Sequence, residues 1–534
     1  MYNIFIKKND FLTSIGGKHM TNIFEKLKSS KEMFAVEGDK ISVDEYIMLS
    51  SIQGIVAQTE AKIVIKNEES YCKYIDFLKN KGYKEKAYDN AWDVVELFKA
   101  YLADFGYIKF DPNVFGDINL AATISGVERW LMIPVALEKQ AVKYGLTKKR
   151  DIQDLAKLDA TTKKVKIFEE YKDKLSKEAL IHQSPNMPQL RDLSIALKLF
   201  CFYTDEKCDN DKAFRKKVFD WADNNIPIMG WSDDEIAFVA DCSEYGKITI
   251  PMDWSSNTSY FADVRTGKPL KQKAKPKKIK AKKGEHYLSI VVSDGDNIQW
   301  ITRDFFTTST FGQRLRGRRD YKISWTFPPM VAMLGSIAAD YIYSVANQND
   351  SFITGVSGAG YINCTSYPDE HLDAFTKLTS DLIKKCDIDV VTMLDNKNNL
   401  ITPEFTQKKL AYYSRFDNIK GGIWELDPDR YESGKGKIYW SDGKPFMSVR
   451  LSMWHPSNDP AKVTDEWVDS YAAAINSYGK DPSKEDGYTI LNIHPWTMTI
   501  NNVERLISKL ESHIKIVSAS EIIELAKKNI TNKN

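Results

Sequence analysis

The sequence contains no long hydrophobic run. None of its 534 residues lie in a stretch that approaches the roughly 18 consecutive apolar residues of a membrane span. The first ten residues also lack the apolar core and cleavage site of a secretory signal. We therefore expect a cytoplasmic protein with no membrane partner.

Cysteine and histidine are both scarce and unpaired. The six cysteines include no C-x-x-C pair, and the seven histidines include no H-x-x-x-H pair. These absences argue against a disulfide framework and against a metal site built from one short motif. No G-x-x-x-x-G-K-[ST] phosphate loop is present either. We predict reduced thiols, no bound metal and no cofactor.

The chain also lacks an excess of charge of either sign. Lys and Arg number 75 against 73 for Asp and Glu, so the formal net charge is only +2. A dedicated nucleic-acid binder needs a strongly basic surface, and we predict no nucleic-acid partner. The sequence does not indicate an oligomeric state.

One local exception marks a predicted domain boundary. Between Lys268 and Lys283 there are nine lysines, two prolines and no acid, a composition that cannot bury a core. We predict a linker over 268–285, between an amino-terminal region at 20–267, which could be subdivided, and a second domain at 286–534. Contact with an anionic polymer is an alternative role for the lysines.

The first 19 residues form a separate predicted segment. Gly16-Gly17-Lys18-His19 precedes Met20 and resembles a translated ribosome-binding site. Our hypothesis is that Met20 is the initiator and that 1–19 is a disordered extension.

The amino-terminal region alternates helical and strand-like patterns. A helical period over 44–56 leads into the β-branched run Lys62-Ile63-Val64-Ile65, and a strand at 107–110 leads into a helix at 119–130. A further strand at 227–231 runs into Ser232-Asp233-Asp234-Glu235, which we interpret as a helix cap. The alternation predicts an α/β layer architecture.

After Gly284, short apolar strands alternate with helical stretches. The predicted strands are 287–292, 322–326, 352–356, 390–394, 421–424, 446–451, 488–493 and 515–517. Seven or eight such units in this length predict a (β/α)7–8 barrel-like domain, whose active site would lie at the carboxyl ends of the strands. An open doubly wound sheet is the alternative.

The predicted strand ends carry carboxylates, imidazoles and indoles. They read Ser-Asp-Gly-Asp-Asn at 293–297, Trp-Thr-Phe-Pro-Pro at 325–329, Ser-Gly-Ala-Gly-Tyr at 357–361, Asp-Asn at 395–396, Glu-Leu-Asp at 425–427, Ser-Met-Trp-His at 452–455 and Asn-Ile-His-Pro-Trp at 492–496. Since the carboxyl ends of parallel barrel strands meet at one mouth, these groups are expected to converge.

Several of these motifs resemble the GxGYxYP family of putative glycoside hydrolases. The likeness is carried by 293–297 with Gln299-Trp300, by 357–361 and by His494-Pro495-Trp496. Upstream, Gln53-Gly54-Ile55-Val56, Asp111-Pro112, Gly230-Trp231 and Asn257 are similar to that family as well. The resemblance spans about 44–528 and implies a carbohydrate-active enzyme with an α/β amino-terminal region and a barrel-like catalytic domain. One departure is that Ile362-Asn363 follows Tyr361, whereas Tyr367-Pro368 comes later.

Cleavage of a glycosidic bond needs one protonated and one ionised carboxyl group. Asp294 and Asp296 lie two residues apart at a strand end, and two close like charges would raise one pKa. Glu425 is the predicted partner across the barrel, with Asp427 and Asp395 behind it. A turn in which Asp294 caps backbone amides is the alternative role for this motif.

The predicted substrate-binding residues are aromatic, small or polar. Trp325, Trp454 and Trp496 offer flat surfaces for sugar rings, unless they belong to the core. His494 could bond a sugar hydroxyl, tune a carboxylate or be a hydrogen-bonded core histidine. The full predicted set is Asn297, Trp325, Gly358, Gly360, Tyr361, Trp454, His494 and Trp496. Gly358 and Gly360 let the backbone approach either a ligand or another strand.

Two other functions remain open at this stage. A metal-dependent polysaccharide deacetylase would use Asp294 or Asp296 with His494 and a divalent cation. A non-catalytic glycan-binding protein would use the same tryptophans and carboxylates without turnover. A glycoside hydrolase acting on short oligosaccharides is the function that we predict, with carbohydrate as the partner.

Overall fold

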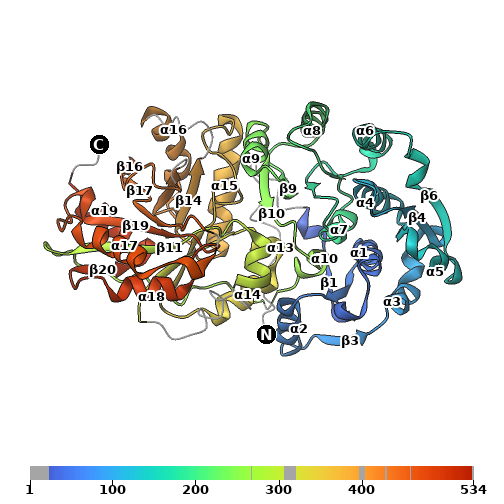
Figure 1. Ribbon diagram of the computed structural model, residues 1–534, viewed down its shortest axis with the longest axis horizontal. Coiled ribbons are helices and arrows are strands. Elements are labelled where there is room, and N and C mark those ends of the chain that lie inside the picture. The colour runs from blue at the N-terminus through green and yellow to red at the C-terminus, as the bar shows by residue number, and fades with distance from the viewer. Residues whose placement is uncertain are drawn as a thin grey trace, which may run out of the picture.

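The computed structural model describes residues 23–265, 267–305, 320–395, 403–426, 430–457 and 459–531 (Figure 1). The predicted extension at 1–19 and the alternative start at Met20 lie outside these residues. Asp427 also lies outside them. Within the described residues, no helix is long and apolar enough to cross a membrane.

The amino-terminal region contains three small sheets, and every pairing in them is parallel. Their orders are β2 (Ala61–Lys66), β1 (Ser29–Glu37), β3 (Lys84–Tyr88); β5 (Leu131–Pro134), β4 (Gly106–Phe110), β6 (Thr147–Asp151); and β10 (Ile248–Pro251), β9 (Pro227–Gly230), β7 (Leu180–His182), β8 (Cys201–Phe202). The α/β prediction for this region is confirmed.

The helices of this region connect and cover those strands. They are α1 (Val43–Ala57), α2 (Glu69–Lys79), α3 (Ala91–Phe98), α4 (Asp117–Glu128), α5 (Glu138–Lys143), α6 (Ala160–Tyr171), α7 (Arg191–Ala196), α8 (Asp209–Trp221), α9 (Glu235–Glu244) and α10 (Thr258–Phe261). Helix α1 begins at a capping box of Ser42 and Glu45, which satisfies two backbone N–H groups at its start. The predicted cap before α9 is also present, because Asp234 accepts a hydrogen bond from the Ala237 N–H.

The carboxyl-terminal region forms two mostly parallel sheets. One has the order β13 (Asp350–Thr354), β12 (Ile323–Phe327), β11 (His286–Val292), β19 (Tyr488–Ile493), β18 (Leu451–Met453), and β20 (Ile514–Val517) also pairs with β11. The other has the order β14 (Val390–Asp395), β15 (Gly421–Leu426), β17 (Lys444–Ser448), β16 (Ile438–Ser441). The helices are α11 (Ile298–Trp300), α13 (Val331–Leu334), α14 (Ser336–Val345), α15 (Asp369–Lys385), α16 (Pro403–Ser414), α17 (Asp465–Ser477), α18 (Ile500–Ser508) and α19 (Ala519–Asn529).

All eight predicted strand positions carry strands, but the closed barrel is not confirmed. The described strands form two separate sheets, and β16 adds an antiparallel edge that the sequence reading missed. Two local connections link the sheets. Val356 and Thr392 form an isolated parallel bridge, and β17 continues through Val449 and Arg450 into β18.

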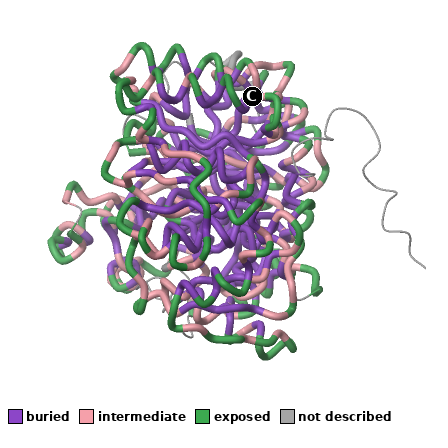
Figure 2. The backbone as a smooth tube through the Cα atoms, turned by 90° about the vertical axis from the view of Figure 1, so that its right-hand side faces the viewer, coloured by how far each residue is buried: buried purple, intermediate pink, exposed green. Residues whose placement is uncertain are grey.

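One hydrophobic core runs through both regions. Its buried residues extend from Ile23 in the amino-terminal region to Ile514 in the carboxyl-terminal region. Figure 2 shows buried backbone through the centre and exposed backbone on the outer helices and loops. The region around β9, β10 and α9 lies in the middle of the elongated molecule, next to α15 (Figure 1).

The lysine-rich segment lies along the carboxyl-terminal region. The Gln272 amide donates to the Phe352 carbonyl at 3.1 Å and accepts from the Phe352 N–H at 2.7 Å. Lys271 and Lys275 form ion pairs with Asp387. The segment is mostly exposed, as its composition predicts, yet it is attached to β13 by side-chain hydrogen bonds.

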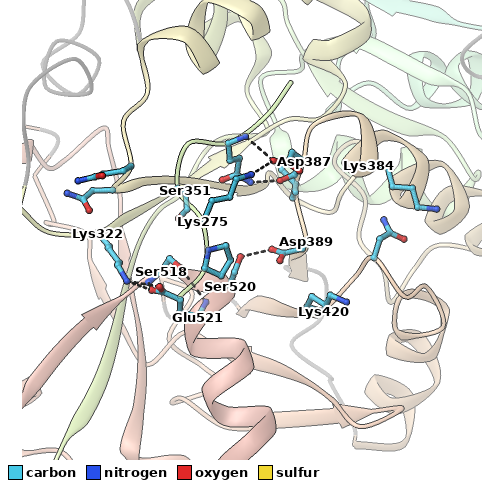
Figure 3. A pocket seen from close by; sticks show the side chains of 17 residues that line it. Lys275, Lys322, Ser351, Lys384, Asp387, Asp389, Lys420, Ser518, Ser520 and Glu521 are labelled. Atoms are coloured by element: carbon cyan, nitrogen blue, oxygen red, sulfur yellow. Dashed lines mark hydrogen bonds and ion pairs between the residues drawn. The ribbon is translucent and has the colours of Figure 1, made fainter. Parts of the chain in front are cut away.

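A polar cavity of about 430 Å³ lies between this segment, α19 and residues that precede strands of the two sheets (Figure 3). Lys322 donates to both carboxylate oxygens of Glu521 at 2.6 Å, and Lys275 pairs with Asp387. The amino ends of barrel-type strands are the end associated with stability rather than catalysis. We therefore interpret this cavity as part of the scaffold.

Glu521 is expected to be a stabilising residue of this scaffold. Its side chain is 1% exposed, and besides Lys322 it accepts from the N–H groups of Lys277 and Ser518. Burial raises the pKa of Glu521, but these donors outweigh it and hold the pKa below its ordinary value. Its stabilising effect is therefore complete at neutral pH and lost as the pH falls through the lowered pKa of the folded state.

Glu521→Gln is expected to lower the free energy of unfolding at pH 7 by about 2 kcal/mol. The reason is that Lys322 and the two backbone N–H groups would lose their charged acceptor in a buried position. Urea denaturation measures this change. Glu524→Gln, on the exposed side of the same helix, is the control. Equal stability of the two variants would show that the Glu521 contacts contribute nothing.

Candidate functional site

The Asp294-Gly295-Asp296 turn follows β11 directly and packs tightly against the end of β12. Asp294 adopts a left-handed backbone conformation with φ of 63°. The Gly295 N–H donates to Thr326 Oγ1 at 2.8 Å, and a Cβ at position 295 would lie 2.1 Å from the Thr326 carbonyl oxygen. Positive φ at a non-glycine residue costs of the order of 1–3 kcal/mol and is common at functional sites.

The two carboxyl groups of this turn have perturbed pKa values. Burial raises the pKa of Asp294 to about 6, although hydrogen bonds from Ser293 and Trp496 act in the opposite direction. Burial, together with the negative charges of Asp294 and Glu235, raises the pKa of Asp296 well above its ordinary value. Asp296 therefore has the stronger tendency to keep a proton, whereas Asp294, with a pKa of about 6, is largely ionised at neutral pH.

His494 lies beside this pair. Its Nε2 is 3.6 Å from Asp294 Oδ2, and its ring stacks on Trp454 with centroids 3.7 Å apart and planes 6° from parallel. Burial and the nearby Arg430 lower the pKa of His494 to about 3. The imidazole is therefore neutral at physiological pH, and the contact with Asp294 is not an ion pair.

A cleft of about 700 Å³ opens between the β10-β9-β7-β8 unit and the carboxyl-terminal region. Its lining residues are Phe115, Tyr203, Asp205, Glu206, Lys207, Ser232, Asp233, Asp234, Glu235, Ile236, Tyr361, Leu394, Tyr431 and Trp454. Clefts of this size, with aromatic walls and a few polar groups, are the usual form of small-molecule sites. Trp454 and Glu235 connect the cleft to His494 and Asp296 respectively.

Trp496 presents a fixed aromatic surface beside Asp294. Its side chain is 49% exposed, and it stacks on Trp300 with centroids 4.5 Å apart. A hydrogen bond also links it to Asp294. The indole is thus held on one face by Trp300 and remains accessible to solvent.

Tyr361 and the glycine beside it hold the two regions together at the cleft. Tyr361 exchanges two backbone hydrogen bonds with Thr249 of β10, and its hydroxyl donates to Glu235 Oε1 at 3.1 Å. A Cβ on Gly360 would lie 2.5 Å from Ile248 Cγ2. Gly360 therefore serves the approach to another strand, which was one of its two predicted roles.

The prediction that Trp325 contacts the substrate is wrong, whereas Gly358 and Asn297 have structural roles and their substrate contacts stay predictions. Trp325 is fully buried, and its indole N–H donates to Asp350 Oδ1 at 3.0 Å, so it belongs to the core and cannot stack on a sugar. Gly358 packs against Thr379 of α15, where a Cβ would lie 2.4 Å from Thr379 Cγ2. Asn297 uses its side-chain oxygen to cap α11 by accepting from the Trp300 N–H.

Glu425 lies in β15 in register with Leu394 of β14. Leu394 lines the cleft, and side chains at paired positions of a parallel sheet point to the same face. The Glu425 side chain is buried, with 2% of the residue exposed. A catalytic role for Glu425 stays a prediction.

Sequence reasoning missed the contribution of the amino-terminal region to this site. The sequence predicts a helix cap at Glu235, yet its charge raises the pKa of Asp296 and it accepts from Tyr361. Burial raises the pKa of Asp253 to about 6, and Gln299 donates to it at 2.9 Å. The available signal was that both acids follow strands, β9 and β10.

Among the residues that the structure describes, no group of three or more His, Cys, Asp or Glu side chains is placed to hold a metal ion.

Comparison with known proteins gives two matches to family models. Residues 284–527 match the model described as "GxGYxYP putative glycoside hydrolase C-terminal domain", and residues 177–263 match the "GxGYxYP third domain". Together the matches span more than half of the chain, and they contain both sides of the cleft apart from Phe115. No protein with a curated description matches.

A solved structure shows the same fold. The crystal structure of a putative hydrolase from Bacteroides thetaiotaomicron VPI-5482 superposes with a TM-score of 0.82 at 24% sequence identity. The match covers 94% of this chain and 96% of that one. The two proteins therefore share the same overall fold.

Proposed function

Because this chain belongs to the GxGYxYP family, we propose that it is a glycoside hydrolase that cleaves its substrate beside the 700 Å³ cleft. The observation that carries the proposal is the pair of carboxyl groups at the end of β11. Their pKa values are both raised, and that of Asp296 is raised further by its neighbours. Pairs of carboxyl groups with separated pKa values are the usual acid and base of this reaction.

We assign the acid to Asp296 and the ionised partner to Asp294. Asp296 would give its proton to the oxygen of the departing sugar as the bond to the anomeric carbon breaks. Asp294 would either attack that carbon or accept a proton from the attacking water. The separation of the two groups in the complex decides between retention and inversion, with about 5–5.5 Å for the first and 6.5–9.5 Å for the second.

Neutral His494 and the aromatic residues have positioning roles in this proposal. The His494 ring stacks on the Trp454 ring and fixes its orientation. Trp454 forms part of the cleft wall together with Tyr361 and Tyr431. Flat rings with polar edges suit the apolar faces and hydroxyl edges of sugars. Glu425 would contribute a further acceptor from β15.

The two carboxyl-terminal sheets would act as one barrel-like frame. The bridge between Val356 and Thr392 joins β13 to β14. Val449 donates to Trp424 of β15 and Arg450 donates to Ile490 of β19, so one continuous strand pairs with both sheets. This arrangement supports a ring of strands whose carboxyl ends carry the site.

The direct test is hydrolysis of a panel of oligosaccharides, with products measured by mass spectrometry. We expect cleavage products with wild-type protein and roughly a thousandfold slower cleavage with Asp296→Asn. Binding without any cleavage across the panel would instead support the glycan-binding role.

The contact between His494 and Asp294 favours one second candidate function, the metal-dependent deacetylase. Release of acetate from acetylated oligosaccharides, measured with and without added Zn²⁺, distinguishes the two. Acetate release with an intact glycan chain would replace our proposal with this one.

Trp496→Ala is expected to raise KM about fivefold with a smaller change in kcat, because stacking of one ring is worth about 1 kcal/mol. Steady-state kinetics on a cleaved oligosaccharide measures both values. Trp254, which is 48% exposed and lies under Arg303, supplies the matched control. Equal effects of Trp496→Ala and Trp254→Ala would contradict a binding role for Trp496.

A further inference from the structure

Two large apolar side chains of the cleft wall are exposed. Phe115 is 48% exposed and Ile236 is 55% exposed, and both line the cleft. They come from different units, because Phe115 lies in the loop between β4 and α4 and Ile236 lies in the first turn of α9. Single exposed apolar side chains are common, but two from separate units that share one concave surface indicate a place where a ligand binds.

The loop that carries Phe115 is held on both sides of this residue. The Asn113 N–H and the Asn113 side-chain amide both donate to Asp111 Oδ1, at 2.9 and 3.1 Å. On the other side, the fully buried Asp117 pairs with Lys163 at 2.9 Å. The ring is therefore presented to the cleft by an ordered loop, which lowers the entropy cost of binding to it.

Phe115 lies farther from the proposed catalytic carboxyl groups than Ile236 does. Ile236 directly follows Glu235, whose charge raises the pKa of Asp296. The Phe115 ring instead meets Tyr203 edge to face, with centroids 5.9 Å apart. Figure 1 shows β4 and α4 on the opposite side of β9 and α9 from β11. The cleft thus extends from the catalytic turn past the start of α9 to the β4–α4 loop.

Polar side chains accompany Phe115 at this end of the cleft. The Tyr203 hydroxyl donates to Asp233 Oδ2 at 2.7 Å, and Asp205 and Lys207 follow Tyr203 at a short distance along the chain. All four line the cleft, and Asp205, Lys207 and Asp233 are exposed. An aromatic ring with polar neighbours suits the apolar face and the hydroxyl edge of a sugar. A purely apolar group would leave those neighbours without hydrogen-bond partners.

We propose that the substrate is an oligosaccharide that spans the cleft, and that Phe115 forms a distal subsite for a sugar unit remote from the bond that is cleaved. Ile236 contacts the chain between this subsite and the catalytic turn. The cleft volume of about 700 Å³ lies within the range of about 300–1,000 Å³ that holds ligands larger than a single sugar ring. This inference rests on the proposed function, because it identifies the substrate length at the same site.

The test is calorimetric binding of cello-, xylo-, manno- and N-acetylchito-oligosaccharides of two to six units, in the Asp296→Asn background that slows cleavage. Affinity is expected to rise about fivefold at the chain length that first reaches Phe115, which is the worth of one aromatic contact. Phe115→Ala should remove this rise and leave shorter chains unaffected, whereas Phe115→Tyr, which keeps the ring, should retain it. Phe105→Ala is the matched control, because Phe105 is 46% exposed just before β4 and is not among the residues that line the cleft.

Cleavage of the same chains by the protein with Asp296 intact separates this inference from the proposed function. A rise that Phe115→Ala abolishes, without cleavage of any chain, supports the distal subsite and overturns the hydrolase. Cleavage with no gain from length, or with a gain that survives in Phe115→Ala, overturns the subsite and leaves the hydrolase. Equal losses in Phe115→Ala and Phe105→Ala, or no binding by any chain, also overturn the subsite. So does Phe115-dependent binding of an octyl disaccharide that is tighter than that of every longer chain, because the occupant would then be an apolar group.

Discussion

Asp296→Asn is expected to lower kcat by roughly a thousandfold while oligosaccharide binding is retained, since loss of a general acid costs about 10²–10⁴ in rate. The amide cannot give a proton to the departing oxygen, but it occupies nearly the same volume as the carboxyl group. Asp481→Asn, at a surface turn where Asp481 accepts from Ser483, is the control and should keep full activity.

The leaving group offers a sharper check on this assignment. A dinitrophenyl glycoside departs as a stable anion and needs little protonation. The deficit of Asp296→Asn on that substrate is therefore expected to shrink to about tenfold or less. An equal deficit on both substrates would contradict an acid role for Asp296.

The second large effect concerns pH. Activity is expected to rise as the pH increases through about 6, where Asp294 ionises, and to fall again at higher pH as Asp296 loses its proton. The two limbs belong to the pair as a unit, because the charges interact. Asp294→Asn should remove the acidic limb and lower kcat/KM at least about a hundredfold. A profile of kcat/KM from pH 4 to 9 measures both effects, and an acidic limb that survives in Asp294→Asn would contradict the assignment.

The same shifts affect stability in the opposite direction. A carboxyl group whose pKa is raised on folding binds more protons in the folded state, so its stabilising effect is present at low pH and is lost as the pH rises to the folded pKa. Both Asp294 and Asp296 should therefore destabilise the protein at pH 7. Asp296→Asn is therefore expected to raise the free energy of unfolding at that pH. Such a gain in stability is typical when a functional residue, and not a structural one, is replaced.

The fold was predictable where local pattern determines it. Strand positions in the carboxyl-terminal region follow from short apolar runs, and every predicted run contains a strand. The division of these strands into two sheets was not predictable, because it depends on contacts between residues far apart in the sequence, such as the bridge between Val356 and Thr392. The burial of Trp325 likewise depends on its partner Asp350, which lies on the neighbouring strand.

The site was predictable only for residues that follow strands of the carboxyl-terminal region. Asp294, Asp296 and His494 are brought together because β11 and β19 are parallel neighbours. The contribution of Glu235 could not be derived, since it arises from docking of α9 and β10 against Tyr361. The acids at that helix start had a sufficient local explanation as caps, and only the tertiary structure shows that they also face a cleft.

The most direct test of the central claim is a crystal structure of Asp296→Asn with an oligosaccharide that the wild-type protein cleaves. The account predicts that a sugar ring lies against Trp454, with the glycosidic oxygen within hydrogen-bond distance of residue 296 and the anomeric carbon facing Asp294. A sugar bound elsewhere, or one whose glycosidic oxygen lies far from both side chains, would contradict it.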